Sequence, residues 1–189
     1  MEPNVFPLAN RASMFAWYVH RHQTRKYTGE PYWNHCRQVA YLIHMLADHK
    51  YADDEEILAA AYLHDCVEDQ EVTPGLIQEL FSERVARLVM EVTDVSKPQD
   101  GNRATRKALD RAHLASASPA GATIKLADLI SNTQSIAKHD KNFARVYLKE
   151  KRLVLPLLCY GDAYLYEEAW MVLKDAEMEI YGQVRDSEG

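Results

Sequence analysis

The sequence predicts an all-α fold, a single domain with about eight or more helices. Apolar residues recur at helical spacing along nearly the whole chain. Glycine and proline, 7 of each among 189 residues, are too scarce for a fold rich in strands and turns. No linker or low-complexity run interrupts the sequence. We therefore expect residues 1–189 to form one domain, with a motif-bearing core over about 8–160 and a C-terminal helix over 162–181.

The N-terminal part of the chain predicts three long helices. An apolar stripe predicts the first over 8–19, and a polar turn with a glycine follows at 24–30. The second should begin near Pro31 and run to about Lys50. The third covers 57–63, where no residue is charged, and two aspartates stand before it as caps. This third helix should be buried on most sides.

The rest of the chain continues the helical pattern. Thr73 and Pro74 form a cap and a first-turn proline, so a helix should begin there and end near Ser82. A polar segment at 97–102 reads as a loop. The other expected helices are one over 83–95, two or three between Arg103 and His139, one over 142–158 and one over 162–181.

Composition excludes several classes of protein. No apolar run is long enough for a membrane span, and the first residues lack the pattern of a secretory signal. The 3 cysteines, an odd number, indicate reduced thiols and a cytoplasmic location. A net charge of −6 argues against binding to duplex nucleic acid. The sequence favours a small-molecule partner and leaves the oligomeric state open.

Charge is distributed unevenly along the chain. Residues 48–71 hold 9 acidic residues against one lysine, whereas residues 97–152 hold 12 basic residues against 5 acidic ones. An acidic block facing a basic block is what a cation and a phosphorylated ligand together require. Solvated helix faces are the simpler explanation for the same asymmetry.

The segment His64–Asp69 (HDCVED) contains several ionisable side chains directly after the apolar helix. Its histidine and three carboxylates lie where a helix is expected to end. Acids at a helix C-terminus oppose the helix dipole, and no basic neighbour offsets them, so an ordinary exposed helix end is disfavoured. Adjacent His64 and Asp65 are plausible ligands of one metal ion.

Two further residues become candidates only if they face this segment. His35 shares the buried stripe of its helix with Val39, so it is either a core histidine bonded to a carbonyl or a ligand. Asp128 belongs to a polar stripe that periodicity alone would assign to a solvated helix face. Arg25 and Lys26, near two aromatic residues, suit a nucleotide but are also common on surfaces.

These residues together resemble the HD-domain metal-dependent phosphohydrolases. The resemblance is to the hydrolase domains of RelA/SpoT homologues and to the small alarmone hydrolases. Its motifs, which span about residues 8–160, are Arg25-Lys26, Gly29-x-Pro31-Tyr32-x-Asn34-His35, Ala61-x-Leu63-His64-Asp65-x-Val67-Glu68-Asp69, Glu91-Val92-Thr93-Asp94 and Lys125-Leu126-Ala127-Asp128-x-x-x-Asn132.

The resemblance implies an all-helical fold, one Mn²⁺ ion (with Fe²⁺ or another divalent metal as alternatives) and removal of the 3′-pyrophosphate of guanosine alarmones. By motif position, the implied roles are metal binding by His35, His64, Asp65 and Asp128, handling of water and its protons by Glu68 and Asp69, and nucleotide binding by Arg25, Lys26, Asn132 and Tyr147.

The chain departs from the family pattern without losing an implied ligand. Cys36 stands where proline usually follows the first histidine, the motif after Asp128 loses a lysine and a tyrosine, and Tyr27 replaces a frequent aspartate. The alternatives are therefore action on another nucleotide (an adenosine-type alarmone, NADPH or a nucleoside monophosphate) and a catalytically silent nucleotide-binding module.

Overall fold

The all-α prediction is confirmed. The computed structural model describes residues 7–182, and in that range the only β-type pairing is one isolated bridge between Thr24 and Pro31. The helices are α1 (Leu8–Val19), α2 (Trp33–Leu46), α3 (His49–Ala52), α4 (Glu55–Leu63), α5 (Cys66–Asp69), α6 (Pro74–Leu80), α7 (Glu83–Val92), α8 (Arg103–Leu114), α9 (Pro119–His139), α10 (Lys141–Val154) and α11 (Ala163–Gly182). Short 3₁₀ turns occupy Pro98–Asp100 and Leu155–Leu158.

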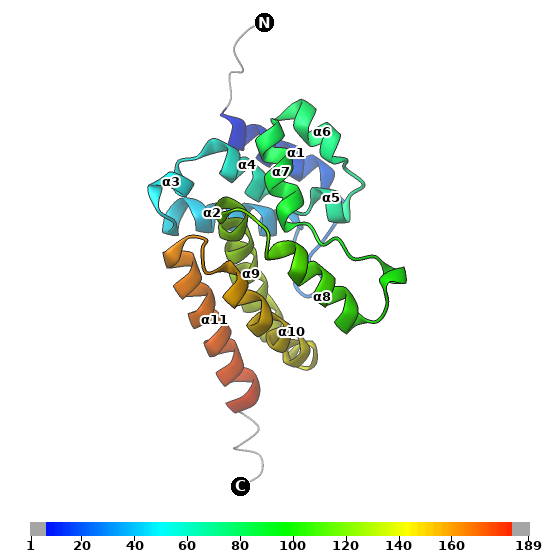
Figure 1. Cartoon of the computed structure of the whole chain (residues 1–189), viewed down its shortest axis with the longest axis vertical. Coiled ribbons are helices and arrows are strands. Elements are labelled where there is room, and N and C mark those ends of the chain that lie inside the picture. Colours follow the sequence, from blue (N-terminus) through cyan, green and yellow to red (C-terminus); the bar gives the residue numbers. More distant parts are fainter. Residues whose placement is uncertain (1–6, 183–189) are drawn as a thin grey trace, which may run out of the picture.

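Two groups of helices meet at the centre of the molecule. Figure 1 shows α1, α4, α6 and α7 gathered at one end, and α9, α10 and α11 running side by side toward the other. Helix α2 contacts α4 in the first group and α9 in the second. The start of α2, the end of α4 and the middle of α9 are thereby brought together.

Helix α4 is buried as its uncharged sequence predicts. Oδ1 of Asp54 caps it by accepting hydrogen bonds from the backbone N–H groups of Glu56 (3.0 Å) and Ile57 (3.2 Å). Ala59, Ala60 and Ala61 are fully buried. Such small side chains let α1, α2 and α7 approach the helix closely, which fixes where its C-terminal residues lie.

Helix α9, with 21 residues, is the longest element among residues 7–182 and the second structural centre. Ser118 caps its N-terminus by accepting a hydrogen bond from the N–H of Gly121, and Pro119 occupies the first turn. It packs against α2, α7, α10 and α11 and buries Ile124, Leu126 and much of its surface. A polar residue in the middle of this helix is therefore held rigidly.

Several predicted boundaries were wrong. The helix expected from Pro31 to Lys50 is two helices, because the backbone is extended at Ala47 and Asp48 caps a new turn at the N–H of Lys50. The N–H of Asp48 is also held by Asp162 (2.9 Å), a contact distant in sequence. Pro31 lies before α2, in the bridge to Thr24.

Other boundaries shifted by a few residues. Helix α7 ends three residues before the expected Val95, since Thr93 is extended. The segment expected to be one helix over 142–158 is α10 followed by a 3₁₀ turn containing Pro156. Helix α11 matches the expected C-terminal helix within a residue. Within residues 7–182, no helix is long and apolar enough to cross a bilayer.

Candidate metal centre

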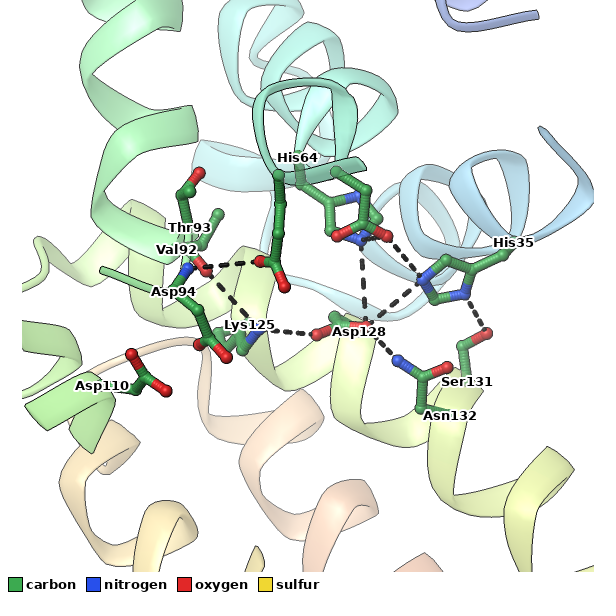
Figure 2. Close-up of polar contacts among 12 residues, drawn as sticks. His35, His64, Val92, Thr93, Asp94, Asp110, Lys125, Asp128, Ser131 and Asn132 are labelled. Carbon is green, nitrogen blue, oxygen red and sulfur yellow. Dashed lines mark hydrogen bonds and ion pairs between the residues drawn. The ribbon is translucent and has the colours of Figure 1, made fainter. Parts of the chain in front are cut away.

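The candidate metal centre lies where α2, α4 and α9 converge. His35 is in the first turn of α2, His64 immediately follows α4, Asp65 precedes α5, and Asp128 lies in the middle of α9. His35, His64 and Asp128 are 1%, 2% and 5% exposed, so the solvated-face interpretation of Asp128 is wrong. Figure 2 shows the two imidazole rings and the Asp128 carboxylate pointing toward one another.

Both imidazoles lie within 4 Å of both carboxylates. Nε2 of His35 is 3.5 Å from Oδ2 of Asp65 and 3.3 Å from Oδ1 of Asp128. Nε2 of His64 is 3.0 Å and 3.8 Å from the same two oxygens. The ligand atoms of His35, His64 and Asp65 all lie within 4.8 Å of one another. The structure thus brings together residues up to 93 positions apart in sequence.

The opposite nitrogen of each imidazole is held by the protein. Nδ1 of His64 donates to the carbonyl of Ala61 (2.9 Å). Nδ1 of His35 lies 2.9 Å from Oγ of Ser131, whose hydroxyl donates to Gln38 (2.8 Å) and therefore accepts from His35. With the proton on Nδ1 in both rings, the Nε2 lone pairs face the carboxylates.

These two Nε2 atoms are buried and lack a hydrogen-bond partner. Burial alone lowers the pKa of His64, but Asp65 and Asp128 outweigh that effect and raise it to about 9, so at neutral pH its Nε2 holds a proton that a bound cation would displace. Burial favours protonation of Asp65, yet His64 and His35 hold its pKa well below the usual range. Imidazole nitrogens without a hydrogen-bond partner that face two ionised carboxylates fit a divalent cation. Such a cation can accept electron pairs from both the nitrogens and the carboxylate oxygens.

Asp128 is surrounded by groups that fix its orientation. Its Oδ2 pairs with Lys125 (2.9 Å), one turn earlier on α9. Its Oδ1 accepts from Nδ2 of Asn132 (2.6 Å), one turn later. Arg25 in turn donates to Oδ1 of Asn132 (3.3 Å). Burial opposes ionisation of Asp128, but Lys125 and the two histidines depress its pKa.

Tyr32 is a site residue that sequence reasoning missed. Its hydroxyl donates to Oδ2 of Asp65 over 2.6 Å, and its ring lies 5.0 Å from that of the buried His20. From the sequence, Tyr32 and Trp33 were grouped as aromatics near a nucleotide. Trp33 instead donates from its indole N–H to Ser13 on α1 (3.2 Å). The sequence placed Tyr32 in the motif that contains His35 but gave it no contact with Asp65.

Glu68 and Asp69 differ in their surroundings. Glu68 is exposed as a residue, but its carboxylate is close enough to protein atoms that desolvation, reinforced by Asp94 and Asp65, raises its pKa to about 7. Oε2 of Glu68 accepts from the N–H of Asp94 (3.3 Å). Asp69 accepts from Nε2 of Gln23 (2.8 Å). Glu68 is thus poised to exchange a proton near neutral pH.

The remaining predicted substrate residues lie on both sides of α9. Nζ of Lys26 lies 5.8 Å from the ring of Phe143 on α10. Tyr147 is 6% exposed, with its hydroxyl 3.3 Å from that of Thr133. Arg25 lines a cavity of about 230 Å³ beside His35, with Asn34 and other polar residues. The structure therefore places Arg25 and Asn132 nearest to the metal centre and Tyr147 within the protein.

Two neighbouring thiols do not add to the ligand set. Burial raises the pKa of Cys36 well above its usual value, and burial together with Asp65 raises that of Cys66. Both thiols stay protonated at neutral pH, and a protonated thiol is a poor metal ligand. A surface hollow of about 610 Å³ along α11 includes no residue of the site.

Comparison with known proteins agrees with this geometry. The HD domain family model matches residues 12–154. The chain is 36% identical over 126 residues to a human protein named guanosine-3′,5′-bis(diphosphate) 3′-pyrophosphohydrolase, covering 66% of this chain and 67% of that one. A Drosophila melanogaster protein of the same name is 36% identical over 123 residues, with 65% of each chain covered.

A Synechocystis protein described as a probable guanosine-3′,5′-bis(diphosphate) 3′-pyrophosphohydrolase is 35% identical over 151 residues. The match covers 78% of this chain but 19% of that protein, so the chain spans about a fifth of that relative and about two thirds of the animal ones.

A solved structure described as a metazoan ortholog of SpoT that hydrolyzes ppGpp superimposes with a TM-score of 0.78 at 27% identity. It covers 93% of this chain and 97% of that one. The resemblance inferred from the motifs is confirmed, and the chain belongs to the HD-domain family.

Proposed function

We propose that this chain removes the 3′-pyrophosphate from guanosine tetra- or pentaphosphate, giving GDP or GTP and pyrophosphate, with one bound Mn²⁺ ion. The observation that carries the proposal is the buried pair of orphaned imidazole nitrogens facing Asp65 and Asp128. Its HD-domain relatives include proteins named for this reaction. As part of the proposal, residues 1–189 act as one domain in the cytoplasm.

His35, His64, Asp65 and Asp128 are the proposed metal ligands. Two imidazoles and two carboxylates form a mixed nitrogen and oxygen donor set, which suits Mn²⁺ or Fe²⁺ better than a sulfur-bound structural zinc. When bound, the cation supplies positive charge that polarises a phosphate oxygen and makes water more acidic. Tyr32 and Asn132 keep the two carboxylates oriented through their hydrogen bonds.

Glu68 is the proposed base. It accepts a proton from the attacking water as the water oxygen bonds to the phosphorus attached to O3′. The bond between that phosphorus and O3′ breaks, and O3′ leaves as the hydroxyl after taking up the proton that Glu68 accepted from the water. We assign the first proton to Glu68 because its pKa of about 7 matches neutral pH. Asp69, held by Gln23, is the proposed second acid of the pair.

Arg25, Lys26, Asn132 and Tyr147 are the proposed nucleotide-binding residues. Support is strongest for Arg25, which is linked through Asn132 to Asp128 and lines the cavity beside His35. A guanidinium there can bind a phosphate through two parallel hydrogen bonds or stack on a base. Tyr147, on α10, is buried, with its hydroxyl 3.3 Å from that of Thr133.

The test is a product assay with matched variants. Purified protein with Mn²⁺ should convert ppGpp to GDP and pyrophosphate, and Asp65→Ala should reduce the rate by more than about a hundredfold. Asp175→Ala, at an exposed position on α11, should behave as wild type. Full activity of Asp65→Ala would refute the assigned ligand set.

The same assay separates the alternatives. Faster turnover of NADPH, an adenosine-type alarmone or a nucleoside monophosphate than of ppGpp would assign another substrate. Binding of ppGpp by the Mn²⁺-loaded protein without release of pyrophosphate would indicate a silent module.

A further inference from the structure

A second cluster of charges lies next to the metal centre, around Lys125. It lines a small cavity of about 30 Å³, between α8, α9 and α10. The charged residues lining it are Asp94, Lys107, Asp110, Arg111, Lys125, Glu150 and Lys151. Lys125 and Asp94 belong to both places, because Lys125 pairs with Asp128 and the N–H of Asp94 bonds Glu68. Figure 2 shows Lys125 and Asp94 between Asp110 and Asp128.

Most charges in this cluster are paired. Lys107 forms ion pairs with Asp94 and Asp110, and Lys125 pairs with Asp128. Glu150 forms a two-bond pair with Arg103 (2.7 and 2.9 Å). All three carboxylates of the cavity are thereby already occupied.

Lys151 is different from the other lysines of the cavity. Among residues 7–182, its ammonium has no hydrogen-bond or ion-pair partner, and its closest contact of note is the ring of Tyr147, 4.9 Å away. Desolvation, followed by the positive charge of Lys125, lowers the pKa of Lys151 to about 8. The pKa values of Lys107 and Lys125 are instead raised, since burial is outweighed by their carboxylate partners.

The side chain of Lys151 is half-buried, and the cavity has no unpaired carboxylate to offer its ammonium. Its position beside the metal centre places that positive charge where a phosphorylated substrate would bring negative charge. The cavity has room for about one water molecule, and therefore for a single oxygen atom of such a group.

We propose that Lys151 is a binding residue for the pyrophosphate group that the reaction removes, to which it donates a hydrogen bond at one phosphoryl oxygen. The two carboxylate oxygens of Asp128 would then face the two ends of the substrate. Oδ1 faces Asn132 and Arg25, where the nucleoside end would lie, and Oδ2 faces Lys125 and the Lys151 cavity. The identity of the anion rests on the proposed function, whereas the presence of an anion-binding lysine does not.

The experiment measures binding of inorganic pyrophosphate to the Mn²⁺-loaded protein by calorimetry, without any turnover. Lys151→Met, which keeps the length of the side chain and removes its charge, should weaken binding at least about tenfold. Lys151→Arg should retain most of the affinity. Lys149→Met, at an exposed position on the same helix, is the matched control and should change binding less than about twofold.

Thermal unfolding at pH 7 distinguishes anion binding from a structural role, because a structural role predicts that Lys151→Met lowers Tm. A lysine with a lowered pKa in the folded state disfavours folding while it is charged. Lys151→Met should therefore leave Tm unchanged or raise it by about 2 °C. A fall in Tm together with unchanged pyrophosphate affinity would mean that Lys151 supports the fold and binds no anion.

The steady-state assay distinguishes the two proposals. If ppGpp is the substrate, Lys151→Met should raise its KM at least about tenfold. Pyrophosphate binding that depends on Lys151 in a protein that does not hydrolyse ppGpp would support the anion site and refute the proposed substrate. Normal ppGpp hydrolysis by Lys151→Met, with wild-type pyrophosphate affinity, would overturn the inference alone.

Discussion

The hydroxyl of Tyr32 donates a 2.6 Å hydrogen bond to Oδ2 of Asp65, the same oxygen that faces both imidazoles. One oxygen therefore has three neighbours, and the tyrosine fixes the direction from which the other two approach. Burial and the charge of Asp65 raise the pKa of Tyr32, so the hydroxyl remains a donor at neutral pH. Tyr32 thus acts as a positioning residue for a proposed ligand.

Tyr32→Phe should weaken metal binding about tenfold to a hundredfold while leaving the fold intact, because it removes only a hydrogen bond to a ligand. Metal titration followed by calorimetry measures the effect, and excess Mn²⁺ should restore most of the rate. Tyr164→Phe, at an exposed position on α11, is the control. An unchanged metal affinity in Tyr32→Phe would show that this hydrogen bond does not position Asp65.

Glu68→Gln should abolish the acidic limb of the pH–rate profile. The pKa of Glu68 is raised from 4.5 to about 7, so the folded protein keeps this proton until neutral pH, and the base form increases as pH rises from 6 to 8. Wild-type kcat/KM should rise through this interval, with its midpoint at lower pH once a cation is bound. The variant should be about a hundredfold to ten-thousandfold slower and lack the limb.

The same shift predicts the sign of an effect on stability. A carboxyl group with a raised pKa favours the folded state below its unfolded pKa, and this contribution is lost as pH rises through about 7. Glu68→Gln should therefore be at least as stable as wild type at pH 8. Urea unfolding at pH 5 and pH 8 checks this, and a clear loss of stability at pH 8 would contradict it.

Asp110→Ala should lower both stability and kcat. Oδ1 of Asp110 accepts from the backbone N–H groups of Val95 (3.1 Å) and Ser96 (2.9 Å), next to the Asp94 N–H that bonds Glu68. Loss of these bonds to a charged acceptor should cost about 2 to 3 kcal/mol of unfolding free energy. Release of the segment should also reduce kcat, because Glu68 loses its fixed partner.

Asp110→Asn is the informative comparison, measured by urea unfolding and steady-state kinetics. Its amide oxygen can still accept both backbone bonds, so it should keep most of kcat and lose mainly the pairing with Lys107. Equal kcat values in the alanine variant and wild type would show that the segment 94–96 does not affect catalysis.

Removal of divalent metal should both inactivate and destabilise the protein. A cation that binds only the folded state adds about 2.7 kcal/mol of stability at one hundred times its Kd. Tm should therefore fall on chelation and recover with Mn²⁺. In Asp128→Asn the metal-dependent part of the Tm shift should be reduced or lost. If chelation left the Tm of the wild-type protein unchanged, this would contradict metal binding by the four proposed ligands.

Local sequence signals predicted the elements with strong caps. Asp54 before α4 and Thr73 before α6 accept from the backbone N–H groups expected of them. The break after Leu46 was not predictable from local pattern, because the N–H of Asp48 is held by Asp162, which is distant in sequence and lies just before α11. Local propensity is overridden where tertiary contacts supply the hydrogen bonds.

The site could be predicted only in part for the same reason. His64 and Asp65 stand out by spacing alone, and the motif resemblance added His35 and Asp128. Ser131 behind His35 and Tyr32 beside Asp65 act across the gaps between helices, where no sequence spacing indicates a contact. Lys151 carried no signal within a basic block, since its lack of a partner is visible only in three dimensions.

Helix α9 supplies Lys125, Asp128, Ser131 and Asn132 within little more than two turns. A continuous, deeply packed helix cannot change the distances among these four residues without breaking its own hydrogen bonds. Any opening that admits substrate or releases product must therefore come from displacement of the shorter neighbours, α2 and the α4–α5 corner. Helix α9 would keep its position during such a displacement.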